Sequence, residues 1–280
     1  MPVRIGYPDS ANAVPLILDS PHSGNVYPDD FRPSMEMNQL RRAEDAYVDE
    51  LFSAAPELGA VLIAANFPRS YIDPNRRDTD VDPARLDGDW TRAAEPGPRS
   101  ARGTGLIWTE MHGKFPIYDR QLTAEEIGVR IDTCWKPYHE ALAEAVQNRR
   151  AIFGRAYHIN CHSMRSMGND KDAGGAVPRP DFVISDREGT SCGREFVDLV
   201  VGVLTGLGYD DVKINDPMKG ADLIRRYSDP ADNRHSLQIE INRRHYMDES
   251  NFEKSDNFET LKNHMSKLIT AAADYAAAAT

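Results

Sequence analysis

Three apolar runs of this sequence each meet a side chain that can bind a metal or transfer a proton. The first, "ILDSPHSGN", ends in a turn of small residues that holds His22. The second, "RAYHINCHSM", carries His158, Asn160 and His162 on one face if it is a strand, because successive strand residues point to opposite faces. The third, "SLQIEIN", places Glu240 on the polar face of an otherwise apolar strand. A buried carboxylate is costly unless it is paired, titrating or bound to a metal, so the three runs together predict a site.

Two histidines that leave two separate strands indicate a metal site. Catalytic zinc usually takes three protein ligands, mostly His with one carboxylate, and leaves a fourth position for water. The carboxylate candidates lie in "RRAEDAYVDELF", where Asp45 and Asp49 are four residues apart and would share one face of a predicted helix. A solvated acidic face is the commoner meaning of such a cluster, but Ala46, Tyr47 and Val48 make this segment less polar than a freely exposed one. The pattern leaves both aspartates open as the third ligand.

A second cluster, "NFPRSYIDPNRRDTD", follows a short apolar run at residues 60–66. Its Arg69, Asn75 and Arg76 could bind a carboxylate, because a guanidinium offers a planar two-point fork and Asn adds an amide donor. In a chain of net charge −11, such a concentration of Arg predicts an anionic small-molecule substrate. The alternative, strongest for Arg77, is a structural network with acidic residues of the same segment: Asp73, Asp78 and Asp80.

Strand-like and helix-like segments alternate along the chain, which predicts an α/β sandwich of three layers around a mixed sheet. Sites in such sheets form at strand ends. The pattern predicts strands at 14–18, 60–66, 156–161, 181–185, 211–215 and 236–242. It predicts helices at 35–58, from Thr123 toward Arg149, at 195–208 and from Phe252 onward. Thr123 and Glu126 have the spacing of a capping box, and Pro137 is a candidate kink.

Composition limits the classes of function. The 280 residues, 40% hydrophobic and 28% charged, show no linker or repeat and predict a single domain over 1–280. The net charge of −11 argues against nucleic-acid binding. The apolar run near the N-terminus is too short for a signal peptide or membrane span. Three cysteines with no C-x-x-C pair fit a reducing cytoplasm.

Six motifs, taken together and in this order, resemble those of the N-formylglutamate amidohydrolase family. They are "SPHSG", "EDAYVDELF", "PRSYIDPNR", "GLIW", "NCHSM" and "LQIEINRRHYMDE", and the resemblance extends from about residue 14 to about residue 270. That family is in turn similar to the zinc carboxypeptidases, which order their site residues in the same way. Family members often read Asp-Thr-Asp-Trp-His where this chain reads Ala-Glu-Asp-Ala-Tyr, and Asp45 is the residue retained.

The resemblance implies a carboxypeptidase-like (phosphorylase/hydrolase-like) fold and one divalent ion, zinc. His22, Asp45 and His162 would hold the ion, and Glu240 would be the general base. Substrate carboxylates would be held by Arg69, Asn75 and Arg76. The implied reaction is hydrolysis of N-formyl-L-glutamate to formate and L-glutamate, a step of histidine degradation, on a small anionic N-acyl amino acid.

Two rival functions share these residues. One is a deacylase of another N-acyl amino acid, or a carboxypeptidase, with the same metal and base but a different pocket. The other is a non-catalytic carboxylate-binding protein on the same fold, against which the intact Glu240 argues. Residues 82–105, rich in Gly and Pro, are a candidate lid. The sequence leaves the oligomeric state open.

Overall fold

The computed structural model describes residues 1–111, 115–168 and 176–278. The chain falls into two compact units, each built from several segments. The first unit comprises Met1–Arg4, Pro21–Ala46 and Ala64–Ala141. The second comprises Ile5–Ser20, Tyr47–Ile63 and Leu142–Thr280.

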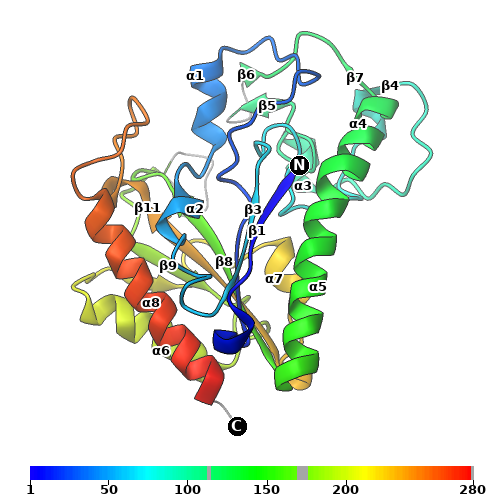
Figure 1. Ribbon diagram of the computed structural model, residues 1–280. Coiled ribbons are helices and arrows are strands. Elements are labelled where there is room, and N and C mark those ends of the chain that lie inside the picture. The colour runs from blue at the N-terminus through cyan, green and yellow to red at the C-terminus, as the bar shows by residue number, and fades with distance from the viewer. Residues whose placement is uncertain (112–114, 169–175, 279–280) are drawn as a thin grey trace. The chain divides into compact units, whose positions relative to one another are not determined.

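A seven-stranded mixed sheet is the framework of the structure (Figure 1). Its strands, in spatial order, are β1 (Val3–Gly6), β3 (Val61–Ala65), β2 (Leu16–Ser20), β8 (Ala156–Met164), β11 (Arg234–Asn242), β9 (Phe182–Ser185) and β10 (Val212–Ile214). The strands β2, β8, β9, β10 and β11 lie wholly in the second unit. Strand β8 is parallel to both of its neighbours, β2 and β11, whereas β9 runs antiparallel to β11. Strand β1 is the one strand of this sheet that the sequence pattern did not predict.

Helices cover both faces of the sheet in the second unit, which makes three layers. On one face of β8, the Tyr157 ring lies 4.7 Å from that of Phe196 and 5.5 Å from that of Tyr275. On the other face, the His158 ring lies 6.5 Å from that of Tyr227. The predicted alternation along β8 and the predicted α/β sandwich around a mixed sheet are therefore confirmed. The helices of this unit are α2 (Val48–Leu51), α6 (Arg194–Gly206), α7 (Asp222–Tyr227), α8 (Phe258–Ala278) and the larger part of α5 (Lys136–Phe153).

The first unit has short elements joined by long irregular segments. Its helices are α1 (Met37–Leu40), α3 (Pro98–Ala101), α4 (Ala124–Arg130) and the first turn of α5, and its short strands are β4 (Leu86–Asp87), β5 (Glu110–Met111), β6 (Phe115–Pro116) and β7 (Leu122–Thr123). Single turns of 3-10 helix occur in both units, at Ser10–Asn12, Arg41–Ala43, Pro83–Arg85, Pro230–Asp232 and Arg243–His245. The candidate lid at 82–105 includes β4 and α3, and its role as a lid stays a prediction.

The single helix predicted at 35–58 is wrong. Helix α1 ends in a 3-10 turn, Glu44 is extended with ψ near 142°, and Tyr47 is left-handed with φ near 64° before α2 begins. Neither conformation can continue a helix, so the apolar spacing that favoured one long helix is divided between two short ones. Asp45 therefore lies in the connecting turn and Asp49 in α2, and the predicted shared helix face does not exist.

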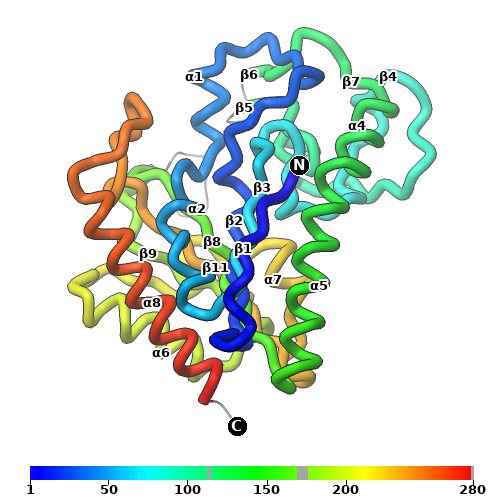
Figure 2. The backbone as a smooth tube through the Cα atoms, in the orientation of Figure 1, coloured from blue at the N-terminus to red at the C-terminus, as the bar shows by residue number. Residues whose placement is uncertain are grey.

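The helix predicted from Thr123 toward Arg149 is confirmed, with an irregularity before Pro137. Thr123 and Glu126 form the capping box: the Glu126 amide donates to Thr123 Oγ1, and the Thr123 amide donates to Glu126 Oε2. Ile131–Trp135 forms a π-helical turn between α4 and α5, and Figure 2 shows the chain passing through it as one continuous helix. Pro137 thus follows an irregular turn and does not end the helix.

Among the described residues, no helix combines the length and the apolar character needed to span a membrane.

Candidate active site

The carboxyl ends of β8 and β11 bring His162 and Glu240 together in the second unit. The two strands are parallel, and His162 and Glu240 are direct register partners. Paired residues of neighbouring strands project from the same face, so the imidazole and the carboxylate are neighbours. Gln238 Nε2 donates to Glu240 Oε1 at 2.8 Å, which fixes the carboxylate from two residues earlier on the same strand.

A chain of buried hydrogen bonds sets the tautomer of His162. The side-chain nitrogen of Asn160 donates to Asp19 Oδ1 at 2.8 Å, so the Asn160 oxygen faces His162 and accepts from its Nε2 at 2.7 Å. Asp19 Oδ1 also accepts from His158 Nε2 at 2.7 Å, and His158 Nδ1 lies 3.1 Å from Ser236 Oγ. With its proton on Nε2, His162 presents the lone pair of Nδ1 as a potential metal ligand.

In the first unit, the turn that holds His22 depends on a glycine. A Cβ at Gly24 would lie 2.3 Å from the carbonyl oxygen of Phe67 and 2.7 Å from that of Ala65, so only glycine allows this close backbone approach. The His22 carbonyl oxygen accepts from the Asp45 amide at 2.9 Å. The small residues after His22 therefore fix its backbone, which in turn fixes that of Asp45.

The His22 ring lies between two buried carboxylates. Its Nε2 is 2.7 Å from Asp73 Oδ1, and its Nδ1 is 3.3 Å from Asp45 Oδ2. A ring that donates its Nε2 proton to Asp73 turns the lone pair of Nδ1 toward an Asp45 oxygen, and two such atoms repel unless a cation or a proton lies between them. His22 and Asp45 therefore fit a cation site, with Asp73 as the carboxylate that would orient the His22 ring.

Asp73 is a site residue that sequence reasoning missed, because it considered Asp73 only as a structural partner of arginine. Asp73 is fully buried and accepts hydrogen bonds from the Arg69 guanidinium, at 2.8 Å from Nη2, and from the backbone amide of Asn75, also at 2.8 Å. Burial alone would raise the pKa of Asp73, but Arg69, His22 and Arg76 outweigh it and hold this pKa well below its usual range. The available signal in the sequence was an aspartate placed directly between Ile72 and Pro74. Asn160 and Gln238 were missed as orienting residues in the same way.

The three arginines of this segment differ in their surroundings. Arg69 lies over the Trp108 ring, with 4.8 Å from its guanidinium carbon to the ring centroid. Arg76 is largely buried and donates to the Asn75 carbonyl at 2.8 Å. Burial lowers the pKa of Arg76 to about 10, so it stays protonated at neutral pH. Arg77 pairs with Glu95 near the surface, which is not one of the acidic residues that the structural alternative named. The pairing with Asp73 that this alternative predicted occurs instead at Arg69 and, at 3.9 Å, at Arg76.

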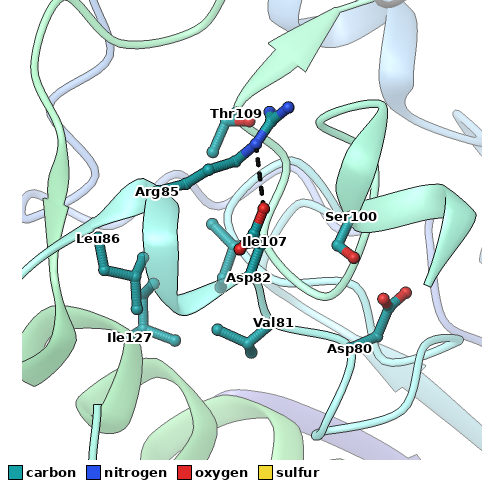
Figure 3. Close-up of a pocket in the computed structure, with 9 residues that line it drawn as sticks. All are labelled: Asp80, Val81, Asp82, Arg85, Leu86, Ser100, Ile107, Thr109 and Ile127. Carbon is teal, nitrogen blue, oxygen red and sulfur yellow. Dashed lines mark ion pairs between the residues drawn. The ribbon is translucent and has the colours of Figure 1, made fainter. Parts of the chain in front are cut away.

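The first unit also contains a small pocket with a different set of lining residues (Figure 3). Arg85 and Asp82 form an ion pair at its wall, with 3.4 Å between Nε and Oδ2, and Leu86 and Ile127 supply apolar surface. None of the site residues that the sequence predicted lines this pocket. It is therefore not the substrate site that those residues describe.

The model of the N-formylglutamate amidohydrolase family matches residues 14–247 of this sequence. The chain belongs to this family. Two N-formylglutamate deformylases, from Pseudomonas putida and Pseudomonas aeruginosa, are each 29% identical to it; the matches cover 85% and 84% of this chain, and 83% of each relative. The crystal structure of the N-formylglutamate amidohydrolase from Ralstonia eutropha JMP134 is 44% identical, with a TM-score of 0.93 over 98% of both chains. A protein from Agrobacterium tumefaciens, 18% identical, shares the fold with a TM-score of 0.65 over 96% of this chain and 95% of its own.

Proposed function

We propose that this member of the N-formylglutamate amidohydrolase family is a zinc-dependent hydrolase. It cleaves the formamide of N-formyl-L-glutamate to formate and L-glutamate, a step of histidine degradation. Family membership and the deformylase relatives support the reaction. The observation that carries the chemistry is the register pairing of a metal-competent histidine, His162, with a carboxylate, Glu240.

The proposed ligands of a single divalent ion are His22, Asp45 and His162. All three are buried, and each offers one ligand atom. Chain continuity supports the set, because Asp19 of β2 pairs with Asn160 of β8. His162 follows Asn160 by two residues on β8, and His22 follows Asp19 by three residues, just past the end of β2. When bound, zinc would polarise the formyl oxygen and make a bound water acidic enough to attack near neutral pH.

The residues of the chain supply the proton transfers and the binding of the substrate. Glu240 takes the proton of the attacking water and delivers it to the nitrogen that leaves as the amine of glutamate. Gln238 holds one oxygen of Glu240, so the carboxylate keeps one orientation through both transfers. Arg69, Asn75 and Arg76 bind the substrate carboxylates, and an arginine near the formyl carbon shares the charge that develops on its oxygen.

Formate release from a panel of substrates tests this function. We expect turnover of N-formyl-L-glutamate that is lost with a chelator and restored by zinc, and weaker turnover of N-formyl-L-aspartate. Release of acetate from N-acetyl-L-glutamate at a higher rate would show a deacylase of another N-acyl amino acid. Full metal content with no turnover of any substrate would instead favour the non-catalytic carboxylate-binding protein.

Arg76→Lys tests the substrate clamp. The change keeps the positive charge but loses the planar fork, so KM for N-formyl-L-glutamate should rise about 10-fold, the size of one charge-assisted hydrogen bond. Arg77→Lys is the matched control, because Arg77 pairs with Glu95. This substitution should leave KM unchanged. Wild-type kinetics in both Arg76→Lys and Arg76→Ala would show that the clamp is misplaced.

A further inference from the structure

The helical stretch from α4 to the start of α5, in the first unit, contacts the backbone of residues 69–76, here called the clamp segment. Three side chains from α4, the π turn and the start of α5 contact three carbonyl oxygens of the clamp segment. Arg130 Nη1 donates to the carbonyl of Tyr71 at 3.0 Å. Trp135 Nε1 donates to that of Arg76 at 3.0 Å, and His139 Nε2 lies 2.9 Å from that of Pro74.

The π turn is what allows these three side chains to point the same way. In a regular α-helix, a step of five residues from Arg130 to Trp135 would rotate the side chain about 140° from the first face. The turn at Ile131–Trp135 is π-helical, and the Lys136 amide donates to the carbonyl of Ile131, five residues earlier. The extra residue brings Trp135 back toward the face of Arg130. His139 follows four residues later, so it lies on the face of Trp135.

These contacts are buried. Trp135 and His139 stack with 3.7 Å between ring centroids and are 4% and 5% exposed. Arg130 is fully buried, lies 4.1 Å from the Tyr71 ring centroid and also donates to Tyr118 Oη at 2.8 Å. Removing a buried donor leaves its carbonyl unsatisfied, so each contact restricts how the clamp segment can move.

We propose that Trp135 and His139 are positioning residues for substrate binding. By holding the carbonyls of Pro74 and Arg76, they fix the side-chain amide of Asn75 and the Arg76 guanidinium in the geometry that receives a substrate carboxylate. This inference rests on the proposed function of Asn75 and Arg76. Neither Trp135 nor His139 touches the substrate; both act through the clamp segment.

Single donors can be removed with little change of shape. Trp135→Phe keeps the stacked ring and loses the indole N–H, and His139→Phe keeps a ring and loses the imidazole donor. His139→Gln keeps a side-chain N–H and serves as the rescue variant. Trp90→Phe is the matched control, since Trp90 Nε1 also donates to a backbone carbonyl, that of Ala93, but in an exposed loop.

The kinetic readout is the split between KM and kcat. KM for N-formyl-L-glutamate should rise about 10-fold in Trp135→Phe and in His139→Phe, with kcat within about threefold of the wild type. His139→Gln should recover most of the loss, and Trp90→Phe should match the wild type. An unchanged KM in both donor-less variants would overturn the proposal.

Amide hydrogen exchange of the substrate-free protein gives a second readout that needs no activity. Exchange at residues 70–77 should quicken in Trp135→Phe and His139→Phe, while exchange at 136–153 stays as in the wild type. Unchanged exchange at 70–77, or faster exchange along the whole of 136–153, would show a merely structural role and reject the proposal. If the wild type fails to hydrolyse N-formyl-L-glutamate, the proposed function falls, and the exchange result still decides whether these residues position the clamp segment.

Discussion

Glu240→Gln should lower kcat by roughly 100-fold or more, the usual scale for losing a general base, while metal and fold are retained. Glutamine keeps the shape of the side chain and its ability to accept from Gln238, but it cannot take a proton from water. A ligand role for Glu240 would instead cost zinc, and a structural role would cost stability without loss of turnover per folded molecule. Metal content, thermal unfolding and steady-state kinetics on one preparation separate the three roles.

Glu249→Gln is the matched control for this change. Glu249 is also a partly buried carboxylate of the second unit with a hydrogen-bonded neighbour, Ser166. It should keep wild-type kcat. A folded, metal-loaded Glu240→Gln enzyme with near-normal turnover would leave the reaction without its base and end the proposed mechanism.

His162→Ala should remove bound metal and activity together. His162 is 3% exposed and presents Nδ1 with its other nitrogen donating to Asn160, so its loss removes one of three proposed ligands. With two ligands left, zinc should dissociate during dialysis, and kcat should fall to background. Metal analysis after dialysis, with circular dichroism to confirm the fold, measures both effects.

His264→Ala provides the comparison for that experiment. His264 lies on α8 and bonds to the Tyr209 hydroxyl at 2.9 Å, so its removal deletes an imidazole that the proposed metal site does not use. It should retain full metal content and activity. Full metal in dialysed His162→Ala would remove His162 from the ligand set.

The parts of the site that lie on regular strands could be predicted from sequence. The alternation of β8 assigned His158, Asn160 and His162 to one face because a strand has a period of two, whatever packs against it. The pairing of His162 with Glu240 could not be read in this way, because register between distant strands depends on tertiary contacts. Strand β1 was missed because it is only four residues long and partly buried, so its apolar pattern is weak.

The errors of prediction lie where the backbone leaves regular structure. The left-handed Tyr47 and the extended Glu44 interrupt a segment whose apolar spacing suits a helix, and local propensity carries no sign of either. Asp73 has contacts from residues as far away as His22, so its neighbours in the sequence suggested only a loop ion pair. In each case tertiary interactions decided the conformation.

The buried hydrogen bonds behind His162 also bear on how enzymes are classified by geometry. Asp19, His158 and Ser236 stand in the acid–imidazole–hydroxyl order of a serine hydrolase, at 2.7 and 3.1 Å. Ser236 is completely buried in the middle of the sheet, so no acyl group can reach its hydroxyl. A template search that compares only residue types and distances would report a nucleophilic triad here, whereas a serine-directed fluorophosphonate should leave this protein unlabelled. Solvent access to the hydroxyl distinguishes a nucleophilic serine from a structural serine that has the same hydrogen-bond partners.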